Sequence, residues 1–155
     1  MELNQKVADF TLQTDEDKTV SLSDFAGKPV ILFFYPKADT PGCTIEACGF
    51  RDTFKKLLSA GAVVLGISRD TPRAQAKFRA KYDLPYTLLA DVDEKVCKQF
   101  GVLKEKNMYG MKTIGIERTT FVIGPDRTLV HIFPKVTPQG HAEEVLKLIE
   151  GMKRG

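Results

Sequence analysis

Three cysteines, Cys43, Cys48 and Cys97, are the residues of this chain whose type and spacing best suit covalent chemistry. Cys43 follows Thr40 and Pro41, which mark the expected start of a helix. The N-terminal end of a helix favours a thiolate over a thiol, and its first backbone N–H groups can hold a polar oxygen beside the sulfur. Position alone leaves two interpretations of Cys43 open, a nucleophile or a small residue that fills a gap in the core.

The neighbours of Cys43 favour the nucleophile. Thr40, three residues earlier, can direct its hydroxyl at the sulfur or at a substrate, while Pro36 and Pro41 shield a thiolate from bulk water and stiffen the loop. The same residues also have structural uses, because Thr40 can cap the helix and Pro36 can end the preceding strand. Both roles can hold together.

The elements that position Cys43 follow from the hydrophobic pattern. Residues 29–35 are continuously apolar, as in a strand buried on both faces, and a helix is expected from about Thr40 to Gly61. A second buried strand over 62–67 and a helix that runs to about Tyr82 complete a strand–helix–strand–helix order. This order predicts an α/β fold with parallel strands.

The rest of the chain adds elements to this unit. They are an N-terminal hairpin over 7–12 and 19–22, a strand over 87–90, a short helix that Asp93 caps and Gly101 ends, a hairpin over 119–123 and 129–133, and a last helix over 138–150. Residues 104–116 are the least regular stretch, and within it we expect residues 107–112 to form a mobile loop that lies over a site. No repeat or linker appears, so residues 1–155 are expected to form a single domain.

Composition limits the class of protein. Hydrophobic residues make up 43% of the chain and charged residues 28%, as in ordinary globular proteins. The net charge of +3 is spread along the chain, so no nucleic-acid footprint is visible. No basic and apolar leader begins the sequence, and the longest apolar run is only about six residues. With three cysteines, an odd number, these features predict a cytoplasmic protein with reduced thiols and no membrane partner.

The segment Pro36-x-x-x-Thr40-x-x-Cys43 matches the full signature of peroxiredoxins, and the chain resembles that family. The second cysteine, five residues after the first, resembles the bacterioferritin comigratory protein branch, also called Q-type. Further segments that carry the resemblance are Gly42-Cys43-Thr44-x-Glu46-x-Cys48-x-Phe50-Arg51-Asp52, Gly66-Ile-Ser68-x-Asp70, Tyr109-Gly110 and Arg118-Thr-Thr-Phe121. The resemblance extends over nearly the whole chain.

The resemblance implies a thioredoxin-like fold with a central mixed sheet, flanking helices and an N-terminal hairpin. It implies a peroxidase that reduces hydrogen peroxide and organic hydroperoxides to water and alcohols through a sulfenic acid on Cys43. Neither a metal nor an organic cofactor is needed. Cys48 would resolve the sulfenic acid by an intramolecular disulfide, and thioredoxin or a similar dithiol would reduce that disulfide. The Q-type resemblance also favours a monomer.

Arg118 matches the position of the family's catalytic arginine, at the start of a strand beside the active-site helix. A guanidinium there would stabilise the thiolate and orient the peroxide. Without the resemblance, the preferred interpretation of Arg118 would be an ordinary exposed arginine at a strand edge.

Helix geometry limits how Cys43 and Cys48 can react. Five residues of ideal helix separate two Cα atoms by about 8.7 Å and rotate them by about 140°, whereas a disulfide needs less than about 7 Å. If the bond forms, the first turns of the helix must therefore unwind. Cys97 shares the apolar face of a short helix with Val96 and Phe100, so its expected role is packing, with resolution of the sulfenic acid as a remote alternative.

Two other functions compete with a peroxidase. A thioredoxin-type disulfide oxidoreductase would need Cys-x-x-Cys, but four residues separate Cys43 from Cys48. A copper or zinc carrier would need a histidine beside these cysteines. His131 and His141 are both late in the chain and lack the spacing of a metal site.

Overall fold

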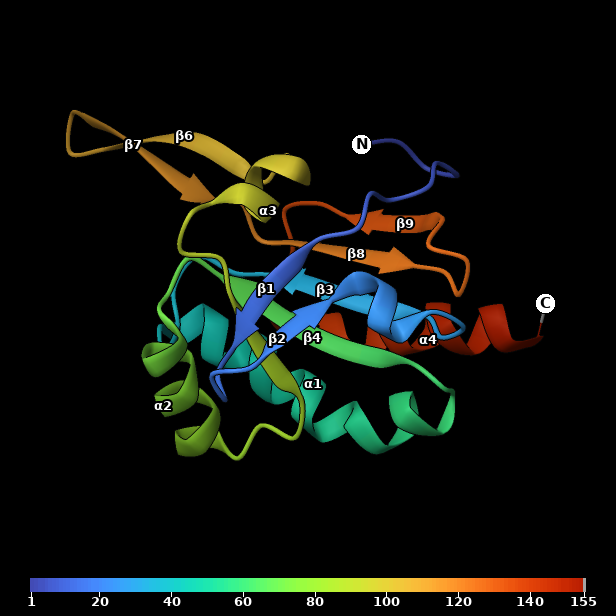
Figure 1. Ribbon diagram of the computed structural model, residues 1–155. Helices are drawn as coiled ribbons and strands as arrows, with labels where there is room; N and C mark the ends of the chain where they lie inside the picture. Colours follow the sequence, from blue (N-terminus) through green and yellow to red (C-terminus); the bar gives the residue numbers. More distant parts are fainter. Residues whose placement is uncertain (155) are drawn as a thin grey trace.

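A seven-stranded mixed sheet forms the centre of the protein (Figure 1), with the strand order β2-β1-β5-β4-β3-β8-β9. The structure, a computed structural model, describes residues 1–154, and at Met108, Lys153 and Arg154 it describes the backbone alone. The strands of the sheet are β1 (Thr11–Thr14), β2 (Thr19–Ser21), β3 (Val30–Phe34), β4 (Val63–Ser68), β5 (Thr87–Ala90), β8 (Thr119–Ile123) and β9 (Leu129–Phe133). Strands β3, β4 and β5 are parallel, and the other pairings in the sheet are antiparallel.

Strand β3 is buried on both faces of the sheet, as its continuous apolar sequence predicts. Because successive side chains of a strand point to opposite faces, Phe33 and Phe34 enter two different hydrophobic clusters. Phe33 stacks on Phe50 with 4.7 Å between ring centroids, whereas Phe34 meets the edge of Phe121 at 5.6 Å. The strand that leads to Cys43 is thus fixed from both sides.

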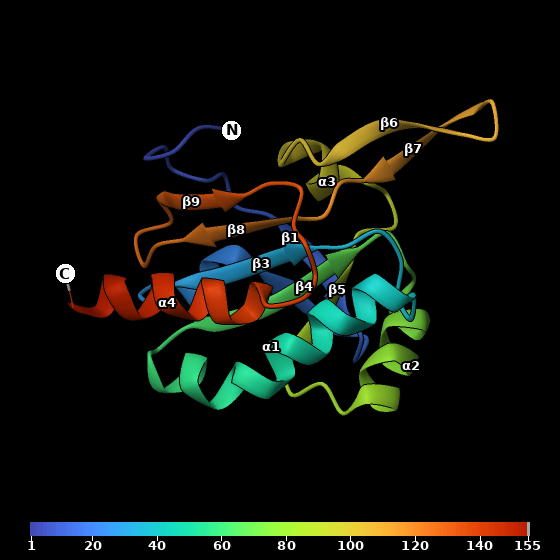
Figure 2. The same ribbon diagram turned by 180° about the vertical axis from the view of Figure 1, so that it is seen from behind.

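Helices cover both faces of the sheet. The helical segments are η1 (Leu22–Phe25), a 3-10 turn, and the helices α1 (Pro41–Ser59), α2 (Pro72–Tyr82), α3 (Lys95–Gln99) and α4 (His141–Arg154). Helices α1 and α4 pack side by side on the face seen in Figure 2, together with α2, and α3 lies on the opposite face. Within residues 1–154, no helix has the length and apolar character required to span a membrane.

The expectation that residues 104–116 are irregular, with a loop over 107–112, was wrong. These residues form the hairpin β6 (Leu103–Met108) and β7 (Met111–Ile116), which projects from the body of the protein (Figure 1). Tyr109 and Gly110 turn the chain with φ of 53° and 77°, and positive φ at both central residues is the requirement of a type I′ turn. Because the first of these positions is a tyrosine, the sequence lacks the Asn-Gly or Asp-Gly pair that usually indicates such a hairpin.

Three smaller expectations also need correction. Strand β1 begins at Thr11, because Val7 instead donates its N–H to the carbonyl of Arg127. Helix α3 is held by the carboxyl group of Asp91, which accepts the N–H groups of residues 96 and 97, and not by Asp93. Helix α4 begins at His141, after a glycine with φ of 77°, three residues later than its sequence pattern suggests.

Candidate active site

Cys43 lies in the first turn of α1, directly after the loop that leaves β3. Thr40 has extended backbone angles and precedes Pro41, the first helical residue, as the sequence predicts. The Thr40 hydroxyl does not cap the helix but donates to the carbonyl of Lys37 at 2.7 Å. Pro36 follows β3 and is half-buried, while Cys43 is only 1% exposed. The thiol is therefore enclosed at the positive end of a long helix.

Strand pairing brings Arg118 to this thiol across 75 residues of sequence. Because Phe34 pairs with Thr119 in the antiparallel β3–β8 ladder, the preceding Arg118 lies beside the loop that leaves β3. Its Nη2 atom donates to Cys43 Sγ at 3.4 Å. A β-carbon at Gly42 would lie 3.0 Å from the same nitrogen, so the glycine makes room for the guanidinium. Arg118 is thus not an ordinary exposed arginine.

Glu46 is the residue of this site that sequence reasoning missed. Its Oε1 atom pairs with Arg118 Nη1 at 2.9 Å, and its side chain is fully buried. The signal was present in the sequence, because Cys43, Glu46, Ala47 and Phe50 follow the spacing of one buried helical face. A carboxyl group on an otherwise apolar helix face is costly to bury unless a hydrogen-bond donor or a cation pairs with it.

Burial and charge act against each other in the Glu46–Arg118 pair. Burial raises the pKa of Glu46 to about 7, although the positive charge of Arg118 opposes this shift. Burial also disfavours the charge on Arg118, but Glu46 and Cys43 outweigh it, so the pKa of Arg118 lies above its ordinary value. Arg118 therefore stays charged, and near neutral pH the proton on Glu46 controls how much of that charge is neutralised.

The raised pKa of Glu46 predicts how stability depends on pH. Between about 4.5 and about 7 the folded state keeps a proton that the unfolded chain has released, so the free energy of unfolding falls as pH rises through this range. Glu46→Gln removes this contribution. We expect urea unfolding at about pH 5 and about pH 8 to show a smaller decrease with pH in the variant than in the wild type. A difference between the two proteins that is independent of pH would contradict the raised pKa.

The other two cysteines are free, and the structure places them differently. Cys48 is half-buried on α1, and burial raises the pKa of its thiol despite the nearby charge of Arg51. Cys97 belongs to the hydrophobic cluster on the opposite face of the sheet from Cys43. Burial and the neighbouring Asp91 raise its pKa strongly. The structural role of Cys97 is therefore favoured.

Both flanks of the segment 40–50 are tied to Tyr82, the last residue of α2. On one side, Asp39 accepts the Tyr82 hydroxyl at 2.7 Å and pairs with Lys81 at 2.8 Å. On the other side, Arg51 Nη1 donates to the Tyr82 carbonyl at 2.9 Å. The two cysteines of α1 thus lie between two attachment points on one helix.

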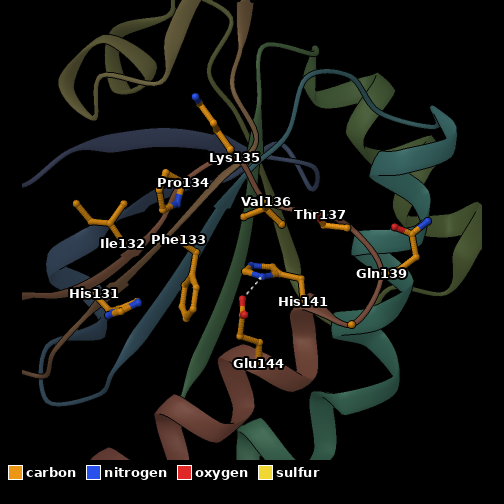
Figure 3. A pocket seen from close by; sticks show the side chains of 11 residues that line it. His131, Ile132, Phe133, Pro134, Lys135, Val136, Thr137, Gln139, His141 and Glu144 are labelled. Carbon is orange, nitrogen blue, oxygen red and sulfur yellow. Dashed lines mark hydrogen bonds and ion pairs between the residues drawn. The ribbon is translucent and has the colours of Figure 1, made fainter.

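A cavity of about 510 Å³ opens between the end of β9 and the start of α4 (Figure 3). The buried ring of His141 lies in it, bonded to Thr120 Oγ1 at 2.8 Å and to Glu144 Oε1 at 3.2 Å. Burial lowers the pKa of His141, against the influence of Glu144. The segment that lines the cavity also contacts the candidate active site. The N–H of Val136, a lining residue, donates to the backbone carbonyl of Arg118 at 2.9 Å. None of the predicted site residues lines the cavity.

The two histidines lend no support to a metal carrier. His131 is half-buried, with its ring 4.4 Å from that of Phe133, and both nitrogens of His141 have hydrogen-bond partners. In the part of the chain that the structure describes, no three His, Cys, Asp or Glu side chains are grouped so as to hold a metal ion.

Comparison with known proteins supports the redox interpretation of the cysteine site. Residues 3–132 match the AhpC/TSA family. A putative peroxiredoxin bcp of Coxiella burnetii is 54% identical over 146 residues, which cover 94% of this chain and 97% of the relative. The peroxiredoxin Bcp of Bacillus subtilis is 41% identical over 152 residues, which cover 98% and 97%.

Solved structures agree with these relatives. The bacterioferritin comigratory protein of Xanthomonas campestris superposes with a TM-score of 0.89 at 38% identity, covering 93% of this chain and 92% of its own. A cysteine-to-serine mutant of PrxQ from Xylella fastidiosa gives a TM-score of 0.93 at 36% identity, covering 98% and 97%. These likenesses confirm the expected thioredoxin-like fold and the resemblance on which it was based. The chain therefore belongs to the AhpC/TSA family and, within it, to the Bcp or peroxiredoxin Q group of thiol peroxidases.

Proposed function

We propose that Cys43 is the peroxidatic nucleophile. The observation that carries the proposal is the 3.4 Å contact between Cys43 Sγ and the guanidinium of Arg118 in the first turn of α1. The thiolate attacks the terminal peroxide oxygen, the O–O bond breaks, and the leaving oxygen takes up a proton to become water or an alcohol. Sulfur gains the transferred oxygen and becomes a sulfenic acid. The alkyl peroxide reduction activity of the Xanthomonas campestris protein supports this substrate class.

Charge develops on the leaving oxygen, and hydrogen-bond donors are needed where that oxygen lies. Arg118 supplies a cation and the N–H groups in the first turn of α1 supply donors without helical partners. The Thr40 hydroxyl donates to the Lys37 carbonyl in this structure, so it has to rotate before it can serve as the third donor. Pro36 shields the thiolate from water on the loop side. Donors that are fixed before the reaction stabilise the transition state without reorganising.

Cys48 is proposed to resolve the sulfenic acid. Its thiolate attacks the sulfur of Cys43, the S–O bond breaks, and hydroxide leaves as water with a proton from the surroundings. In the structure, the pKa of Cys48 is raised and the helix holds the two Cα atoms too far apart for a bond. Both obstacles are removed when the first turns of α1 unwind, so resolution is coupled to local unfolding.

Oxidation by one equivalent of peroxide is expected to link Cys43 to Cys48 within one chain and to unwind α1 around them. The loop that closes is short, so the main opposing terms are the lost helix hydrogen bonds and the packing of Phe50. Peptide mapping of the oxidised protein tests the pairing, and hydrogen exchange over residues 40–55 tests the unwinding. A Cys43–Cys97 bond, or unchanged protection in that segment, would refute the switch.

The proposed reductant is thioredoxin or a similar dithiol protein. A coupled assay of peroxide-dependent NADPH oxidation, with thioredoxin and its reductase, tests the whole cycle. Hydrogen peroxide and an organic hydroperoxide are compared as substrates. Consumption of peroxide with a small dithiol but not with thioredoxin would show that the peroxidatic step is right and the reductant wrong.

The protein is proposed to act as a monomer. The proposed site residues and the proposed resolving cysteine all lie in one chain, so no second copy is required for the cycle. Light scattering at micromolar concentration is expected to give the mass of one chain. A stable dimer would contradict the proposal.

A further inference from the structure

A chain of hydrogen bonds runs through the interior beneath the loop between β3 and α1. The Tyr35 hydroxyl donates to Gln75 Oε1 at 2.5 Å, and Gln75 Nε2 donates to Ser68 Oγ at 3.0 Å. The Ser68 hydroxyl donates to Asp70 Oδ2 at 2.5 Å, and the same oxygen accepts the Ala38 N–H at 2.8 Å. The hydrogen-bond chain therefore begins and ends in the loop that precedes Cys43.

This network is well satisfied, and three of its members are fully buried, whereas Asp70 at its end is half-buried. Tyr35, Ser68 and Gln75 are each 0% exposed. Burial raises the pKa of Tyr35 well above its ordinary value, so its hydroxyl stays protonated and acts as a donor. Gln75 Nε2 also donates to the Leu89 carbonyl at 2.8 Å. A buried polar network is stable only when its members are paired, and when complete it holds its members in one arrangement.

We infer that Asp70 is a positioning residue for the peroxide reaction. Its carboxyl group touches no reacting atom but holds the Ala38 N–H, and so fixes the loop that places Thr40 at the start of α1. The inference rests on the proposed role of Cys43. Peroxide reduction depends on holding the substrate oxygen in line with the sulfur, and a displacement of about 1 Å can lower such a rate about 100-fold.

Two rate constants of the Cys43 thiolate, one with peroxide and one with iodoacetamide, distinguish a positioning role of Asp70 from a general disruption of the site. Reaction with peroxide needs an oxygen held by the loop and the helix end, whereas alkylation by iodoacetamide needs only an accessible thiolate. In Asp70→Ala we expect the rate constant with hydrogen peroxide, measured by competition with a haem peroxidase, to fall about 10- to 100-fold. The alkylation rate should change by less than about threefold. Asp70→Asn keeps an oxygen that can accept both bonds and should restore the peroxide rate to within about threefold of wild type.

Asp9, which is distant from Asp70 in the sequence, is a matched control because it accepts hydrogen bonds of the same kinds. It accepts the Ser23 N–H at 2.9 Å and the Ser23 hydroxyl at 2.7 Å, the same kinds of donor that Asp70 serves. Asp9→Ala should leave both rates unchanged. If Asp70→Ala does not fold, Tyr35→Phe removes a single oxygen from the other end of the network and should lower the ratio of the peroxide rate to the alkylation rate in the same direction.

Three results would overturn the inference: a full peroxide rate in Asp70→Ala, parallel losses in both rates, or an Asp70→Asn variant that does not recover. If the Asp70→Ala protein does not fold, an unchanged ratio in Tyr35→Phe would overturn it. A different result would show that the proposed function of Cys43 is itself wrong. In that case Cys43→Ser, measured in the same assay, would keep the peroxide consumption of the wild-type protein.

Discussion

Cys43→Ser is expected to abolish peroxide turnover, with a loss on the order of 10⁴-fold or more. A serine hydroxyl fits the same place in the first turn of α1, but it does not supply the anion that attacks the peroxide oxygen. Arg118 then faces a neutral group, while the fold should persist because only one atom changes. The measurement is the coupled assay with hydrogen peroxide, together with circular dichroism.

The other cysteines provide the comparison. Cys97→Ala changes a side chain in the hydrophobic cluster on the far face of the sheet, so turnover should persist. Cys48→Ser should still react once with peroxide, but should lose recycling by the proposed dithiol partner. Substantial turnover in Cys43→Ser would show that Cys43 is not the nucleophile. The contact between Arg118 and Cys43 would then have no role in catalysis.

Arg118→Ala is expected to slow the peroxide step by about 10²- to 10³-fold, the usual effect of removing one fixed donor from a developing negative charge. The loss should appear in the rate constant with peroxide and not in the later reduction by a dithiol. The variant also leaves the buried carboxyl group of Glu46 without its cation, so some loss of stability is expected. The double variant Arg118→Ala/Glu46→Gln removes that secondary effect.

Two further arginine variants sharpen the result. Arg118→Lys keeps the charge but replaces a planar fork by a single ammonium, which is poorly shaped to serve both Cys43 and Glu46, so an intermediate rate is expected. Arg79→Ala is the matched control, since Arg79 is also a partly buried arginine paired with a carboxylate, Asp15, at 3.1 Å. An Arg118→Ala rate equal to that of Arg79→Ala would return Arg118 to a structural role.

Local patterns predicted those parts of the fold that depend on local sequence. The apolar run before Pro36 gave β3 almost to the residue, and Pro41 gave the start of α1. The turn at Tyr109 and the capping of α3 by Asp91 were missed, because one needs a positive φ at an unusual residue and the other a side chain four residues before the helix. The resemblance supplied the thioredoxin-like architecture with its central mixed sheet, which no local pattern contains. The order of the strands came only from the structure.

The candidate site shows the same limit. Thr40, Pro36 and Pro41 are close to Cys43 in sequence, and these neighbours together favoured a reactive thiol. The ion pair between Glu46 and Arg118 spans 72 residues and exists only because β8 pairs with β3 in one register. A sequence can show that a carboxyl group lies on an apolar stripe, but only the packed structure shows which cation meets it.

The attachment of Arg51 to Tyr82 bears on how quickly the enzyme can be reset. If the segment 40–50 unwinds as proposed, the remainder of α1 stays anchored and helical. Starting a helix is slow because several residues must be ordered before the first bond is made, whereas extending one is not. Rewinding from an existing helix end proceeds on the order of nanoseconds per residue. After the disulfide is reduced, the return of Cys43 to its place beside Arg118 is therefore a matter of helix elongation, far faster than any chemical step of the cycle.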